Sequence, residues 1–239
     1  MIHIYGPVKS RRLGLSLGIS LTPHKICSLD CVYCQLGKTS VLTLNRREYI
    51  KINGILKEFR SWLSNNPVEA KKLKFVTLSG AGEPSLNTGI GKLILGIKKI
   101  AKVKVAVITN STLIFDKNLR KDLLQADLIV PSLDAITQDV FEKIDRPVKG
   151  VIVKDIVDSL VKLREEFSGK IWLEVMIVKG INDSLDEIKK IKEAADKVNP
   201  DLIQINSPVR TTAEKNVFCV SKDKLNKIKN IFGKKAQVI

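Results

Sequence analysis

Short runs of valine, isoleucine and leucine alternate with longer amphipathic segments along most of the chain, and this alternation constrains the fold most. The expected strands cover 15–21, 73–78, 103–109, 128–133, 171–178 and 202–205, and the expected helices cover 49–63, 87–100, 116–124, 137–144, 151–167 and 184–198. Helical crossovers join parallel strands. We therefore expect an α/β fold, a partial (βα)6 TIM-like barrel two units short of the closed form. A lysine-rich amphipathic helix over 221–232 is expected at the barrel edge.

The length of 239 residues suits one large domain, and a hydrophobic content of 44% predicts a packed core. We expect a single domain over 1–239, with residues 1–14 as an N-terminal extension and 211–239 as a C-terminal extension. Gly6-Pro7 indicates a turn or loop in the first of these. No apolar run reaches the roughly 18 residues of a membrane span, and the start lacks a signal pattern. A cytoplasmic protein without a membrane partner is expected.

Three of the four cysteines lie in one loop with the spacing C-x3-C-x2-C: Cys27, Cys31 and Cys34. Thiolates hold iron-sulfur clusters, and three of them leave one iron of a 4Fe-4S cluster open to an exogenous ligand. Structural zinc, the competing interpretation, prefers four closed ligands, and an odd set of thiols suits disulfides poorly. The fourth cysteine, Cys219, is interpreted as an ordinary buried thiol, with a radical-relay or covalent role as the alternative.

The cysteine loop, with the aromatic Tyr33 just before its last cysteine, resembles the cluster-binding motif of the radical S-adenosylmethionine (radical SAM) superfamily. The resemblance implies that SAM binds the open iron and is cleaved reductively to a 5'-deoxyadenosyl radical, which abstracts hydrogen from a substrate. It also implies a partial (βα)6 barrel, in agreement with the strand count. A flavodoxin- or ferredoxin-like one-electron donor is the partner implied for this chemistry.

Chemistry in parallel βα folds lies at the carboxyl ends of the strands. Gly80-Ala81-Gly82-Glu83 follows one such strand and resembles the family's Gly-Gly-Glu motif, which binds the amino group of SAM. Either Gly80 or Gly82 is the first contact, and Glu83 is a partner for the ammonium or a brace of the loop. The resemblance places Tyr33 with these cofactor-binding residues.

Polar side chains at the other strand ends complete the candidate cofactor site. Two interpretations stay open for Asn110, which faces SAM or caps a turn. Two also stay open for Ser132 and Asp134, which the family resemblance implies bind the ribose, or which lead into a helix cap. Glu174 is expected to contact the cofactor or to pair with a buried cation. The remaining strand-end candidates are Met176 and Asn206.

A formal net charge of +16 favours a polyanionic partner, with RNA first among them. Arginine binds anions with two parallel hydrogen bonds, and Arg11, Arg12 and Arg210 are the candidates for holding the substrate. The Gly-Glu-Pro sequence and the basic charge resemble the branch that includes wyosine-forming tRNA enzymes, which makes a tRNA base the expected substrate. Two alternatives stay open: a glycyl-radical-enzyme activase that acts on a protein, and a non-catalytic cluster-bearing module for RNA binding or electron transfer.

Overall fold

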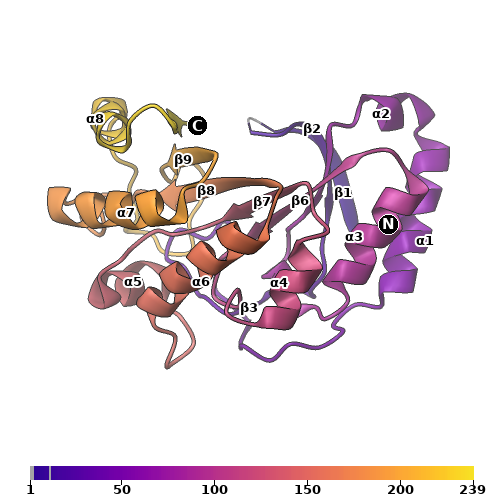
Figure 1. Cartoon of the computed structure of the whole chain (residues 1–239), viewed down its shortest axis with the longest axis horizontal. Helices are drawn as coiled ribbons and strands as arrows, with labels where there is room; N and C mark the ends of the chain where they lie inside the picture. The colour runs from indigo at the N-terminus through magenta and orange to yellow at the C-terminus, as the bar shows by residue number, and fades with distance from the viewer. Residues whose placement is uncertain (1–2, 11) are drawn as a thin grey trace.

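The protein, as a computed structural model that describes residues 3–10 and 12–239, is built on one curved eight-stranded sheet (Figure 1). The strand order is β1-β2-β5-β6-β7-β8-β9-β10, and every neighbouring pair is parallel except β1 and β2. These strands are β1 (Ile4–Ser10), β2 (Gly14–Ile19), β5 (Phe75–Leu78), β6 (Lys104–Thr109), β7 (Leu128–Pro131), β8 (Lys170–Met176), β9 (Leu202–Asn206) and β10 (Ala236–Val238).

Helices follow one another around the outside of the sheet (Figure 1). They are α1 (Ile52–Asn65), α2 (Pro67–Lys72), α3 (Ile90–Ile100), α4 (Lys117–Leu123), α5 (Gln138–Asp145), α6 (Val153–Glu166), α7 (Leu185–Val198) and α8 (Lys222–Phe232), with a short 3-10 helix, η1 (Pro84–Leu86). The expected helix over 221–232 is thus present, and α8 packs on β9 and β10 at one edge of the sheet.

Side chains alternate between the two faces of the sheet, as the pleat requires. Val105 and Val107 of β6 belong to the main core under the helices, whereas Ala106 between them belongs to a second, smaller cluster with Leu13, Leu128 and Val130. Burial of a leucine or isoleucine side chain in these clusters stabilises the folded state by roughly 1.5–3 kcal/mol. The smaller cluster fills part of the concave face, and Leu13 reaches it from the turn between β1 and β2.

The α/β class and the parallel sheet predicted from the sequence are confirmed. The six expected strands correspond in order to β2, β5, β6, β7, β8 and β9. No closed barrel forms from the described strands, because β1 and β10 occupy opposite edges of the sheet and do not pair with each other.

Both segments expected as extensions contribute a strand to the sheet: β1 pairs with β2, and β10 pairs with β9. The prediction of a turn at Gly6-Pro7 was wrong, because both residues lie inside β1, where the register with β2 shifts between Tyr5 and Val8. Pairing with β2 holds the backbone of β1 extended even though it contains these turn-forming residues. The division of 1–239 into one domain with two extensions stays a prediction.

Candidate functional site

A small parallel ladder anchors the cysteine loop below the carboxyl ends of the strands. It consists of β3 (Ile26–Cys27) and β4 (Val41–Leu42), in which Cys27 pairs with Leu42. The amide of Thr43 donates to the carbonyl of Cys27 at 2.9 Å. These backbone bonds fix the position of the first thiol before any cofactor binds.

The three loop thiols are free and differ in their surroundings. Burial raises the pKa of Cys27 to about 12, and burial together with the nearby carboxylate of Asp145 raises the pKa of Cys31 well above its usual range. Cys34 lines a pocket on the concave side. Buried thiols of this kind ionise only with a cation beside them, and a metal supplies that cation.

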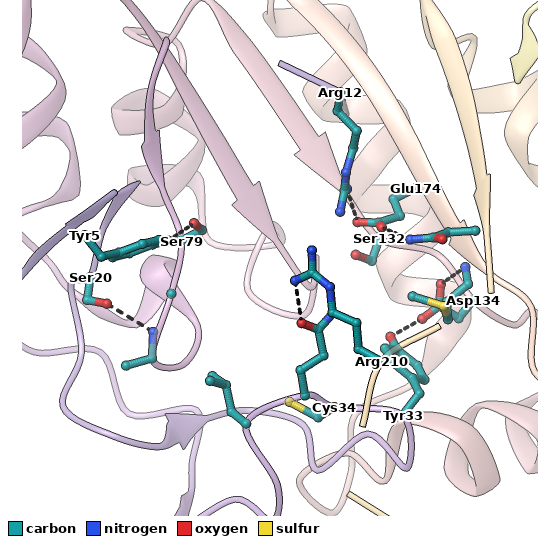
Figure 2. A pocket seen from close by; sticks show the side chains of 16 residues that line it. Tyr5, Arg12, Ser20, Tyr33, Cys34, Ser79, Ser132, Asp134, Glu174 and Arg210 are labelled. Carbon is teal, nitrogen blue, oxygen red and sulfur yellow. Dashed lines mark hydrogen bonds and ion pairs between the residues drawn. The ribbon is translucent and has the colours of Figure 1, made fainter. Parts of the chain in front are cut away.

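The pocket beside Cys34 has a volume of about 610 Å³ and opens at the strand ends (Figure 2). Nine of the residues that line it were expected from the sequence as cofactor or substrate residues: Arg12, Tyr33, Gly80, Ser132, Asp134, Glu174, Met176, Asn206 and Arg210. Residues from the ends of β5, β7, β8 and β9 therefore meet beside one loop thiol, as expected for the strand ends of a parallel sheet.

The donor set fits an iron-sulfur cluster with SAM beside it. Three free thiols come from one loop, and one of them faces the pocket. Gly80 adds a cradle: its φ is +110°, and a Cβ there would stand 2.3 Å from Oγ of Ser20. Only glycine leaves that part of the pocket wall open. Among the described residues, no three His, Cys, Asp or Glu side chains are gathered around a point where a single metal ion could be held.

The two glycines of the Gly-Ala-Gly-Glu turn have different surroundings. Gly80 and Ala81 line the pocket, and Oγ of Ser20 accepts a hydrogen bond from the amide of Ala81 at 3.1 Å. Gly82 instead packs against the cysteine loop, because a Cβ there would stand 2.0 Å from the carbonyl oxygen of Ile26. Of the two glycines, Gly80 is therefore the one at the pocket wall.

Glu83 is placed as a brace of the turn. Its carboxylate is 3% exposed and accepts hydrogen bonds from Oγ1 of Thr109 at 2.6 Å, from the amide of Asn110 at 2.8 Å and from the amide of Ser85 at 3.0 Å. Burial raises the pKa of Glu83 even though these hydrogen bonds lower it. It does not line the pocket beside Cys34. Both oxygens thus hold the end of β6 against the β5 turn.

Asn110 braces the cysteine loop in a similar way. Its Nδ2 donates to Oγ of Ser28 at 2.9 Å and to Sγ of Cys27 at 3.5 Å, and its Oδ1 accepts from Oγ1 of Thr112 at 2.8 Å. Like Glu83, it lies outside the pocket beside Cys34. These contacts orient the thiol of Cys27.

Tyr33 and Asp134 form a buried pair on the pocket wall. The Tyr33 hydroxyl donates to Oδ2 of Asp134, whose Oδ1 accepts from the amide of Met176 at 2.8 Å. Burial raises the pKa of Tyr33 well above its usual range, and burial and Asp145 raise the pKa of Asp134. Asp134 does not cap the following helix. The amides of Ile136 and Thr137 at the start of α5 donate to Glu187 of α7.

The arginine candidates are arranged around Glu174. The carboxylate of Glu174 is 2.8 Å from Nη1 of Arg12 and accepts a weak hydrogen bond from Nδ2 of Asn206 at 3.5 Å (Figure 2). Glu174 thus pairs with a cation, which is one of the two possibilities that the sequence left open, and the cation is Arg12. Arg210 donates to the neutral side chain of Gln35 at 2.9 Å. Arg11 lies outside the described residues.

Four polar pocket residues were missed from the sequence. Ser20 stands one residue past β2, so the strand-end rule could have found it. Ser79 is at the end of β5 and hydrogen-bonds through Oγ to the hydroxyl of Tyr5 at 2.7 Å (Figure 2). Tyr5 comes from β1, which was not expected as a strand. Gln35 follows the last loop cysteine, where no pattern singled it out.

An open parallel sheet with a cysteine loop and a pocket at its strand ends defines a partial-barrel protein of the kind that binds an iron-sulfur cluster. The sequence profile of the Radical SAM superfamily matches residues 21–195. The chain therefore belongs to the radical SAM superfamily of enzymes.

Relatives of known sequence match between 77% and 98% of the chain. A protein named GTPase Obg from Brachyspira hyodysenteriae is 39% identical over 230 residues, which are 96% of this chain but 33% of that protein. A UPF0026 protein from Methanocaldococcus jannaschii is 33% identical over a match that covers 98% of this chain and 72% of that protein. A probable dual-specificity RNA methyltransferase RlmN from Thermotoga maritima is 28% identical over 77% of this chain and 53% of its own.

Two solved structures share the fold. A radical SAM methyltransferase from Sphaerobacter thermophilus has a TM-score of 0.69 at 15% identity, covering 94% of this chain and 65% of its own. TYW1 with a lysine-pyruvate adduct bound has a TM-score of 0.65 at 17% identity, covering 91% of this chain and 72% of its own. In the described part of the chain, no helix has the length and apolar character needed to cross a membrane.

Proposed function

We propose that this chain binds a 4Fe-4S cluster through Cys27, Cys31 and Cys34 and binds SAM in the adjoining pocket. When bound, these cofactors supply a 5'-deoxyadenosyl radical by one-electron cleavage of SAM. The observation that carries the proposal is that Cys34 shares one pocket of about 610 Å³ with the polar side chains at the strand ends.

The residues of the chain position and shield this chemistry. Gly80 keeps the wall near Ser20 open for the methionine part of SAM, while Ser132 and Asp134 offer hydrogen-bonding groups at the end of β7. Met176 adds an apolar surface beside them. Contacts that hold the cofactor in one orientation reduce the entropy that must be lost when the cofactor and the substrate reach their reactive arrangement.

The substrate proposed is RNA, with a tRNA base at the pocket. A net charge of +16 favours a polyanion, and Arg210 stands at the pocket without an acidic partner among the contacts described for it. The similarity to a probable RNA methyltransferase is consistent with an RNA substrate. A protein substrate, as a glycyl-radical-enzyme activase would require, suits this charge less well.

The first test is anaerobic. The cluster is reconstituted, dithionite and SAM are added without substrate, and 5'-deoxyadenosine is measured. We expect slow formation that is lost in Cys31→Ala and retained in Cys219→Ala. Cys219 is a matched control because it is a free thiol outside the loop, and it is exposed, so the interpretation of it as a buried thiol was wrong. A full cluster that neither cleaves SAM nor changes its spectrum on adding SAM would refute the proposal in favour of a non-catalytic module.

The RNA substrate is tested separately by a salt series with bulk tRNA. Neutralising several phosphates makes the affinity fall steeply with salt, by about 10³-fold or more between 50 and 200 mM for six or more contacts. Arg210→Gln should weaken binding and reduce the salt slope. No binding even at low salt would remove RNA as the substrate class and leave the cofactor chemistry untouched.

A further inference from the structure

Tyr5 of β1 reaches the pocket beside Cys34 by crossing the neighbouring strand. Its backbone pairs with Gly18 of β2, and its hydroxyl is hydrogen-bonded at 2.7 Å to Oγ of Ser79, just past the end of β5. The side chain therefore spans the width of β2. Figure 2 shows Tyr5 across the pocket from Asp134 and Glu174.

Two glycines make room for the Tyr5 ring. A Cβ at Gly18 would stand 2.1 Å from Cζ and 2.2 Å from Cε2 of Tyr5, and a Cβ at Gly80 would stand 3.1 Å from Cε1. The ring thus lies closely on β2, because Gly18 has no side chain to hold it away. The hydrogen bond to Ser79 fixes the far end of the ring. A ring held in place in this way loses little conformational entropy when a ligand packs on it.

The ring has a side that the protein does not cover. Tyr5 is 40% exposed although its hydroxyl is bonded and its ring lies on β2, and it lines the pocket. Aromatic side chains do cover strand glycines to stabilise a sheet. That role accounts for the position of the ring over Gly18, but it does not require an exposed aromatic surface at the wall of a pocket.

The exposed apolar surface continues along β1 beyond the pocket. Val8 pairs with Ser16, which lies two residues before Gly18 in β2 and so on the same face of the sheet. The register shift between Tyr5 and Val8 therefore brings both side chains to the concave face, and Val8 is 46% exposed. Because β1 is an edge strand, this path leads from the pocket into solvent.

We propose that Tyr5 is the stacking platform for one base of the substrate RNA, and that the strand leaves the pocket over β1, past Val8. The inference rests on the proposed function, because it concerns how the RNA substrate binds in the same pocket. Stacking on an aromatic side chain holds any base by its flat face, whatever its hydrogen-bonding groups. Tyr5 thus positions the RNA, and the hydrogen-bonding side chains across the pocket are left for the cofactor.

Arg210 provides the cation that a nucleic-acid site needs beside an aromatic ring. It lines the same pocket and donates to the neutral side chain of Gln35 at 2.9 Å, and in the described part of the chain no salt bridge engages it. Sites for single-stranded nucleic acids combine cations for the phosphates with aromatic rings for the bases. The net charge of +16 favours such a polyanion.

The proposed orientation of SAM leaves the Tyr5 ring free. The methionine part is placed near Gly80 at the end of β5, and the hydrogen-bonding groups for the remainder lie at the end of β7. In the sheet, β7 is separated from β1 by β2, β5 and β6. The adenine of SAM is therefore directed away from Tyr5, and the base that stacks there belongs to the substrate.

The test measures the binding of bulk tRNA to reconstituted protein with SAM present, from 50 to 200 mM salt. Tyr5→Leu removes the ring, and Tyr5→Phe keeps the ring but removes the hydroxyl. Tyr49→Leu is the matched control, because the hydroxyl of Tyr49 also makes one hydrogen bond, to the carbonyl of Asn45 at 2.8 Å, while its ring does not line the pocket. Melting temperatures show whether each variant folds.

We expect Tyr5→Leu to bind tRNA about fivefold or more weakly at every salt concentration, as for the loss of one stacked base. Its salt slope should equal that of the wild type, because the ring neutralises no phosphate. Tyr5→Phe should stay close to the wild type, and Tyr49→Leu should match it. Ultraviolet crosslinking of tRNA to the wild-type protein, located by mass spectrometry, needs no variant and should label Tyr5.

Equal tRNA affinity of folded Tyr5→Leu and the wild type overturns the inference and leaves the RNA substrate standing. So do crosslinks confined to other parts of the chain, and so does an equal loss of affinity in Tyr5→Phe and Tyr5→Leu, which would assign the contact to the hydroxyl. A weaker SAM affinity of Tyr5→Leu in calorimetry, with tRNA affinity unchanged, would assign the ring to the cofactor instead. Failure of the wild type to bind tRNA refutes the proposed substrate class, and the platform with it.

Discussion

Replacing Gly82 with alanine should separate the Gly-Ala-Gly-Glu turn from the cysteine loop. The added methyl carbon would stand 2.0 Å from the carbonyl oxygen of Ile26 and 2.7 Å from Oγ1 of Thr22, where ordinary contact begins near 3.4 Å. The backbone must therefore move by more than an ångström, and the same carbonyl accepts the Glu83 amide at 3.1 Å. Overpacking costs about 1–3 kcal/mol and the strained hydrogen bond about 1 kcal/mol more.

We expect Gly82→Ala to lower the free energy of unfolding by about 2–4 kcal/mol, measured by urea denaturation of the metal-free protein. Iron bound per chain after reconstitution should fall too, because Ile26 precedes Cys27. Gly54→Ala is the control: apart from its own helical turn, no atom lies within 4 Å of its added carbon, and in the first turn of α1 alanine should stabilise by less than about 1 kcal/mol. A Gly82→Ala protein with wild-type stability and full iron loading would refute the packing argument.

Three further outcomes follow from the site. Arg12→Met should lower the free energy of unfolding by about 2–3 kcal/mol by leaving buried Glu174 unpaired, discounted for the partial exposure of the arginine; adding Glu174→Gln should restore more than half of the loss. Burial raises the pKa of Glu83, so stability should fall as the pH rises from the unfolded value of about 4.3 through the raised pKa, and Glu83→Gln should flatten the melting temperature over that range. Gly80→Ala should weaken SAM binding in calorimetry, since its added carbon meets Ser20.

The central strands could be predicted from the sequence because burial on both faces leaves a continuous apolar run. In β6, for example, Val105 and Val107 face the helices and Ala106 faces the concave side, and all three are fully buried. Edge strand β1 carries no such signal. It contains Gly6-Pro7 and exposed polar residues, and only its pairing with β2 makes it a strand.

The site was predicted to the level of strand ends, which the chain order fixes. Side-chain partners were not, because they depend on how neighbouring turns meet in space. Glu83 and Asn110 stand at strand ends, yet their polar atoms are taken by the chain itself, Glu83 by Thr109 and Asn110 by Ser28. Arg12 reaches Glu174 across the concave face, a contact that no spacing in the sequence reveals.

The unpaired edges of the sheet set a rule for the size of what can react here. A closed barrel would admit only molecules that pass through its mouth, and a pocket of about 610 Å³ would limit them to a few linked rings. Because β1 and β10 are not paired, a long polymer need not pass through a closed ring of strands to reach the pocket. For the RNA substrate proposed above, one nucleotide would occupy the pocket while the rest of the strand stays in solvent, so recognition would depend on that nucleotide and not on the length of the RNA.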